Sequence, residues 1–221
     1  MTRVLFHKEI EALEDEVLVL GSMAEKALLD AMEALRDGDL QWSQKLIEDD
    51  RKINAKRFEI EEKCIFVIAS QQPMATDLRG LVSMLFIITD LERIADHAEG
   101  IARINMMLGD EPLPRRLGLL PSMADRAVAM LRDSLKAYIE RDANEARRIC
   151  EADDEVDRLQ DRIYEDVTRS MIEDPSTIER NTYLLWTSHN LERIADRCTN
   201  ICERVIYMVT GEMHEINVSK Y

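Results

Sequence analysis

The sequence repeats itself once, and this limits the folds available to it. The hexapeptide Leu-Glu-Arg-Ile-Ala-Asp occurs at residues 91–96 and again at residues 191–196, an offset of 100. Upstream of the hexapeptide, individual residues of the first half recur in the second half at an offset of 103. Asp50, for example, matches Asp153. A repeat on this spacing predicts two copies of one structural unit, with three residues lost from the second copy.

Helix-breaking residues are few and fall at regular intervals. The chain has 7 Gly and 5 Pro in 221 residues, which leaves too few turns for an all-β fold. The breaks fall at residues 38–39, 72–73, 109–121, 142 and 174–175. The segments between them have helical periodicity, and this predicts helices over about 7–37, 40–71, 75–108, 121–141, 143–172 and 176–211.

We therefore predict an all-α protein made of two similar three-helix bundles, with six long helices related by an internal pseudo-twofold axis. The predicted parts are a first bundle, a linker, a second bundle and a polar tail: 1–109, 110–121, 122–212 and 213–221. In the first segment, apolar residues recur every three or four positions from Ile10 to Ala34. This spacing is typical of one buried helix face.

The chain is strongly acidic. It has 29 Lys and Arg against 44 Asp and Glu, a net charge of −15, which repels nucleic acid and anionic lipid surfaces. No apolar run is long enough for a signal peptide or a transmembrane helix, and the four Cys do not resemble a disulfide scaffold. We expect a cytoplasmic protein that binds no nucleic acid and reaches a membrane only indirectly, through partners.

Acidic residues interrupt the apolar helix faces at matching places in both halves. They form four pairs of oxygen-bearing side chains, each pair one helical turn apart: Asp50 with Asn54, Glu92 with Asp96, Asp153 with Asp157, and Glu192 with Asp196. Neighbouring carboxylates repel each other, so a cluster of such pairs favours a bound cation. Oxygen ligands suit hard cations such as Mg, Ca and Mn, or iron held through carboxylates. The pattern predicts one metal site in each bundle, and solvated charged helix faces are the alternative.

Motifs that would indicate an enzyme are missing from the sequence. Carboxylate-bridged di-iron bundles carry Glu-x-x-His, but the residues three before each His are Val4, Ile94, Trp186 and Gly211. The chain also has no phosphate-binding Gly-rich loop, no Gly-x-Ser-x-Gly and no His-Glu-x-x-His. We expect no enzyme activity. A carboxylate-rich bundle for metal storage or redox chemistry is the alternative.

Three stretches of the sequence together resemble the PhoU family of phosphate-signalling regulators. They are the duplicated hexapeptide, the turn sequence Gln-Gln-Pro-Met-Ala-Thr-Asp-Leu-Arg at residues 71–79, and Asp-Arg-Cys-Thr-Asn-Ile-Cys-Glu at residues 196–203. The resemblance extends over roughly residues 7–212. Ala95 and Ala195 stand where the family usually has Gly, and Asn54 stands where a strict acidic pair has Asp.

The resemblance implies a cytoplasmic adaptor. PhoU-like proteins couple the ATPase of the high-affinity phosphate ABC transporter to a sensor histidine kinase. When phosphate is plentiful, they repress the phosphate-starvation response and restrain uptake. Members are often dimeric, so a homodimer is expected. Some bind multinuclear metal clusters through Glu/Asp-x-x-x-Asp pairs, which here are the four pairs named above. The expected cofactors are metal ions, with iron, zinc, magnesium and manganese as candidates.

Overall fold

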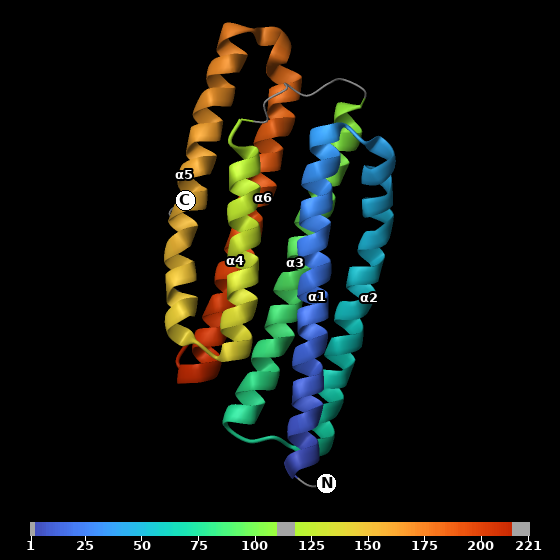
Figure 1. Ribbon diagram of the computed structural model, residues 1–221, viewed down its shortest axis with the longest axis vertical. Coiled ribbons are helices and arrows are strands. Elements are labelled where there is room, and N and C mark those ends of the chain that lie inside the picture. Colours follow the sequence, from blue (N-terminus) through green and yellow to red (C-terminus); the bar gives the residue numbers. More distant parts are fainter. Residues whose placement is uncertain (1–2, 110–117, 214–221) are drawn as a thin grey trace.

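The computed structural model describes residues 3–109 and 118–213. These residues form six α helices and a short 3-10 helix: α1 (Arg3–Asp37), α2 (Leu40–Gln71), α3 (Thr76–Leu108), α4 (Leu120–Glu140), α5 (Ala143–Glu173), η1 (Pro175–Thr177) and α6 (Ile178–Thr210). Helices α1–α3 form one bundle and α4–α6 the other (Figure 1). The all-α prediction of two three-helix bundles is confirmed. Residues 110–117 of the predicted linker and residues 214–221 of the predicted tail lie outside the described residues.

Two helix starts differ from their predicted positions. The first helix begins at Arg3 rather than near residue 7, because Phe6 belongs to the core and is 8% exposed. The sixth begins at Ile178, after the 3-10 turn η1. Asp174 stabilises that turn by accepting hydrogen bonds from Ser176 N at 3.0 Å and Ser176 Oγ at 2.7 Å.

The apolar face predicted for the first segment is the buried face of α1. Its central residues are each at most 3% exposed: Leu13, Val17, Leu20, Ala24, Ala31 and Ala34. Ile10 and Ala27, at the edges of this face, are only partly buried. The packed core runs through both bundles. None of the described helices is long and apolar enough to cross a lipid bilayer.

The start of the second helix in each bundle is capped by an aspartate at the same repeat position. Gly38, with φ of +66°, ends α1, and Asp39 Oδ1 then accepts a hydrogen bond from Trp42 N at 2.8 Å. In the second bundle, Asp142 Oδ1 accepts from Asn144 N at 2.9 Å and from Glu145 N at 3.0 Å. These caps satisfy backbone donors that have no partner within the helix.

Helices α3 and α6 pack against each other in the middle of the molecule, while α2 and α5 lie at opposite edges (Figure 1). Asp90 Oδ1 on α3 accepts hydrogen bonds from Arg197 Nη1 at 3.4 Å and Asn200 Nδ2 at 3.3 Å. One hundred residues later, Asn190 Oδ1 on α6 lies 3.1 Å from His97 Nδ1 on α3. The Asn190–His97 contact matches the Asp90–Arg197 contact under the predicted pseudo-twofold axis, whereas the bond from Asn200 has no counterpart because Gly100 stands at the matching position.

Candidate metal centres

The structure brings acidic side chains of α2 and α3 together in the first bundle. Burial, and then the negative charges of Asp96, Glu99 and Glu92, raise the pKa of Asp50 to about 6. We call these four residues the first acidic cluster. Glu99 was not among the predicted ligands, although its spacing from Glu92 and Asp96 places it on the same face of α3.

Three hydrogen bonds partly neutralise the first acidic cluster. Arg93 Nη1 donates to Asp96 Oδ2 at 2.7 Å, and Arg103 Nη2 donates to Glu99 Oε1 at 2.5 Å. Asn54 Nδ2 donates to Asp50 Oδ2 at 2.7 Å. Asn54 is therefore next to the cluster, as the sequence predicts, but its amide presents a donor to Asp50.

Two carboxylate oxygens of the first acidic cluster are buried and accept no hydrogen bond: Asp50 Oδ1 and Glu92 Oε2. The second lies 3.4 Å from Arg93 Nε, close enough for charge attraction but without a hydrogen bond. Burial, and then the charge of Asp96, raise the pKa of Glu92. Buried acceptors without a donor are costly, and a bound cation would satisfy them.

The second bundle brings together all four of its predicted ligands. Burial and then the charge of Asp196 raise the pKa of Glu192 to about 7, against the opposing charge of Arg193, while Asp157 and Asp153 add smaller upward shifts. Asp153 is 3% exposed. We call the four acidic residues, which come from α5 and α6, the second acidic cluster.

The two acidic clusters share their local contacts. Arg193 Nη1 donates to Asp196 Oδ2 at 2.7 Å, the same contact that Arg93 makes in the first bundle. Glu192 Oε2 is buried without a hydrogen bond, like its counterpart in Glu92, and lies 3.3 Å from Nδ1 of the exposed His189. The repeat therefore preserves an unsatisfied carboxylate oxygen as well as the acidic pairs.

The negative charge and the unsatisfied carboxylate oxygens of both clusters suit a bound cation. Their side chains, however, are not arranged around a common point as metal ligands are. Within residues 3–109 and 118–213, no three His, Cys, Asp or Glu side chains are arranged to hold an ion. Asp96 and Asp196 both point to an arginine. Each of these bonds occupies Oδ2 and leaves Oδ1 of the same carboxylate for an ion.

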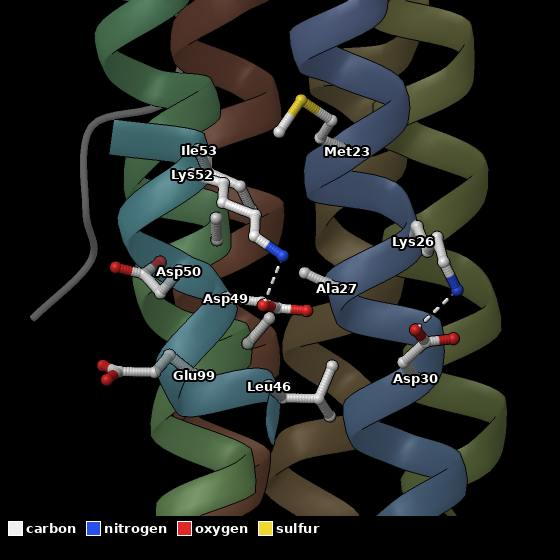
Figure 2. Close-up of a pocket in the computed structure, with 12 residues that line it drawn as sticks. Met23, Lys26, Ala27, Asp30, Leu46, Asp49, Asp50, Lys52, Ile53 and Glu99 are labelled. Carbon is white, nitrogen blue, oxygen red and sulfur yellow. Dashed lines mark hydrogen bonds and ion pairs between the residues drawn. The ribbon is translucent and has the colours of Figure 1, made fainter. Parts of the chain in front are cut away.

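A cavity of about 160 Å³ lies between α1, α2 and α3, beside the first acidic cluster (Figure 2). Two ion pairs line it, Lys26 with Asp30 and Lys52 with Asp49, each at 2.6 Å. Figure 2 shows the carboxylate of Asp50 pointing away from the Lys52–Asp49 pair. Asp50 and Glu99, two members of the first acidic cluster, also line the cavity, so the cavity borders the cluster.

Small side chains are among those that line this cavity in the first bundle. Ala27 and Ala98 line it, and the matching residues of the second bundle are Met130 and Cys198, which are 2% and 0% exposed. Ala27 lies in the apolar row of α1, and the alignment of the two halves matches the small Ala27 with the larger Met130.

The family model for the PhoU domain matches residues 17–104 and again residues 120–205. The chain belongs to the PhoU family. One match falls in each bundle, so the family's domain is the three-helix unit that the repeat predicts.

Relatives of the PhoU family match nearly the whole chain. The phosphate-specific transport system accessory protein PhoU homolog of Clostridium acetobutylicum is 41% identical over 218 residues, which span 98% of this chain and 100% of the relative. The phosphate-specific transport system accessory protein PhoU of Escherichia coli (strain K12) is 35% identical over 207 residues, 94% of this chain and 86% of the relative.

Solved structures of the PhoU family share the fold. The crystal structure of PhoU from Pseudomonas aeruginosa has a TM-score of 0.88 at 34% identity, and the match covers 94% of this chain and 100% of that one. The phosphate transport system regulatory protein PhoU from Streptococcus pneumoniae also gives a TM-score of 0.88, at 31% identity and over 95% and 99% of the two chains. The family resemblance inferred from the motifs is confirmed.

Proposed function

We propose that this chain is an accessory regulator of phosphate transport. The observation that carries the proposal is its similarity over 98% of its length to a relative named as an accessory protein of the phosphate-specific transport system. The match to PhoU structures at a TM-score of 0.88 supports the same role. In this role the chain acts by contact with partner proteins and is not an enzyme.

The proposed partners are the ATPase subunit of the phosphate ABC transporter and a sensor histidine kinase. The chain contacts them on the cytoplasmic side of the membrane as a homodimer, represses the phosphate-starvation response and restrains uptake when phosphate is plentiful. Its net charge of −15 favours basic partner surfaces, because complementary charge speeds encounter and selects partners.

A phosphate-starvation reporter in phosphate-rich medium tests this role. A strain that lacks the gene should express the reporter, and complementation should switch it off again. A reporter that stays off in the deletion strain, with no second homologous gene in the genome, would contradict the proposed repression.

We further propose that each acidic cluster binds metal ions. The ligands are those predicted from the sequence: Asp50, Asn54, Glu92 and Asp96 in the first bundle, and Asp153, Asp157, Glu192 and Asp196 in the second. Support comes from the buried, unsatisfied oxygens and from the raised pKa values of Asp50 and Glu192. A bound cation supplies positive charge, which ties α2 to α3 and α5 to α6 and lets the carboxylates stay ionised.

Metal analysis of protein stripped with a chelator and reloaded with Mg, Mn, Fe(II) or Zn tests the ligands. A four-carboxylate variant should lose the bound ions: E92A/D96A/E192A/D196A. A matched control removes two exposed carboxylate pairs of the same spacing and should keep them: E11A/D15A/D161A/E165A. Wild-type protein that binds none of these ions would refute the ligand assignment and leave the adaptor role untouched. Dozens of iron atoms per chain would instead favour metal storage.

A further inference from the structure

The outward face of α2 carries exposed apolar side chains. Phe58, Ile65 and Phe66 are 56%, 54% and 68% exposed, and Ala55 and Ala69 are also exposed. Phe58 and Ile65 are seven residues apart, close to two helical turns, so they lie on the same side of the helix. We call these five residues the α2 strip.

The fold does not require apolar residues at this surface. Helix α5 occupies the corresponding place in the second bundle, and its residues that match the three large side chains of the strip are polar: Asp161, Thr168 and Arg169. The same helical unit therefore packs with a polar surface in one half and an apolar surface in the other. The α2 strip is therefore a feature of the first half alone.

The α2 strip lies in a stretch with no net charge, on a protein that carries −15. Residues 55–69 contain three basic and three acidic residues: Lys56, Arg57, Lys63, Glu59, Glu61 and Glu62. The basic ones are paired within the chain, Arg57 with Glu61 and both lysines with Glu59 and Glu16. Two copies of an acidic protein repel each other, so they approach most easily where most carboxylates are paired within the chain, as Glu16, Glu59 and Glu61 are beside the strip. A basic partner is drawn instead to the acidic surfaces.

The α2 strip is also open to a second copy. Among the described elements, α2 packs against α1 and α3 alone, and it lies at the edge of the molecule (Figure 1). A groove of about 350 Å³ between α1 and α2 adjoins the strip and is lined in part by Ala12, Leu13 and Phe66. The groove enlarges the apolar surface that a second copy can cover.

We propose that two copies of this chain associate through their α2 strips, packed antiparallel about a twofold axis that places Phe58 against Ile65 of the second copy. This names the surface of the homodimer in the proposed function and rests on that part of it. The strip is about 21 Å long, and an interface built on it falls short of the roughly 800 Å² per partner of stable complexes. The dimer should therefore dissociate on dilution.

Sedimentation velocity over a range of concentrations tests the surface. Wild-type protein should shift from the monomer mass of 25.6 kDa toward twice that mass as its concentration rises. The variant F58D/I65T/F66R, which carries the residues of α5 at the matching positions, should remain monomeric with an unchanged circular dichroism spectrum. The control I172T removes an apolar residue of α5 that is 76% exposed and should dimerise like the wild type.

The outcomes separate the surface from the rest of the function. A wild-type protein that is monomeric at its highest soluble concentration overturns the homodimer and its surface together. A triple variant that still dimerises overturns the surface alone. Because molar mass is independent of the phosphate reporter, neither result depends on whether the regulatory role is correct.

Disulfide trapping tests the antiparallel arrangement. Glu62 lies between Phe58 and Ile65 and hence close to the proposed twofold axis, so E62C should form a covalent dimer when treated with oxidised glutathione. Glu165 is the matching residue of α5, and E165C should remain monomeric. The native cysteines are all buried. No cross-link in E62C, or equal cross-linking in both variants, overturns the arrangement.

Discussion

Asn105 on α3 ties the three helices of the first bundle together. Its Nδ2 lies 2.8 Å from Ser43 Oγ, 3.0 Å from Ala34 O and 3.3 Å from Asp39 O, and the residue is 1% exposed. The carbonyl of Ala34 belongs to the last turn of α1, where carbonyl groups lack a partner within the helix. One buried amide therefore closes the end of α1 and fixes the start of α2.

Replacing Asn105 by leucine should lower the free energy of unfolding by about 2–3 kcal/mol, because buried polar groups lose their partner. Urea denaturation followed by circular dichroism measures this change. The exposed Asn144 provides the control, and N144A should alter stability by no more than about 0.5 kcal/mol. A loss of similar size in both variants would show that the buried amide has no special role.

Glu192 should make the stability of ion-free protein depend on pH. Its pKa of about 7 in the folded protein exceeds the value of about 4.3 for an unfolded chain. Folding therefore favours the protonated form, and this stabilisation is present at low pH and lost as the pH rises through about 7. E192Q, which imitates the protonated side chain, should be more stable than the wild type at pH 8 by roughly 1–2 kcal/mol.

The difference between E192Q and the wild type should shrink as the pH falls and vanish below about pH 4, where Glu192 is protonated in both the folded and the unfolded chain. Denaturation series with a chelator present, at several pH values, measure it. E140Q, at the exposed end of α4, should show no such trend. An E192Q difference that is equal at pH 5 and pH 8 would contradict the raised pKa.

At the level of helices, Ala27 lines the cavity between α1, α2 and α3, and the matching residue of the second bundle is the larger Met130. A27M copies Met130 into the first bundle and should fill part of the cavity, raising the free energy of unfolding by about 1 kcal/mol. M130A should open a cavity in the second bundle and cost about 2–4 kcal/mol. Chemical denaturation of both variants tests the pair. If A27M destabilises the protein as much as M130A does, side-chain size at this position does not explain the cavity.

The helices themselves could be predicted because their determinants are local. Gly38 and Pro175 mark turns directly, and the spacing from Leu13 to Ala34 identifies the buried face of α1. The 3-10 turn before Ile178 was missed, because a proline in the sequence does not distinguish a 3-10 turn from the first turn of an α helix.

Part of the candidate site could also be predicted, because the i, i+4 spacing fixes which carboxylates share a helix face. Which helices meet is not local information. The pairing of Asp90 with Arg197 depends on α3 packing against α6, and nothing near either residue in the sequence signals it. Asn54 shows a second limit, since spacing places its side chain beside Asp50 but does not say whether oxygen or nitrogen faces it.

At the scale of the whole molecule, the two acidic clusters are connected through the interface between α3 and α6. Helix α3 carries Glu92 and Asp96, α6 carries Glu192 and Asp196, and these two helices pack against each other. Ions that bind the folded clusters better than the unfolded chain stabilise the entire fold.

Metal loading should therefore raise the melting temperature of the wild type. At an ion concentration 100-fold above the dissociation constant, each site adds about 2.7 kcal/mol, which corresponds to roughly 5–10 °C for a chain of this size. Differential scanning calorimetry with and without the ion measures the shift. The four-carboxylate variant should show none, while its matched control should behave like the wild type. An equal shift in both variants would place the ions elsewhere.

The α3–α6 interface is not symmetric, because Asp90 and the matching Asn190 meet different side chains. This asymmetry affects which halves can pair while the chain is being synthesised. The first half of the chain leaves the ribosome before the second and meets first halves from neighbouring ribosomes. If two first halves paired, Asp90 would face His97 and Gly100 in place of Arg197 and Asn200. Burial lowers the pKa of His97, and Gly100 offers no side-chain donor, so the carboxylate of Asp90 would be poorly satisfied. The α3–α6 contacts therefore suit pairing of the first half with the second half better than pairing of two first halves.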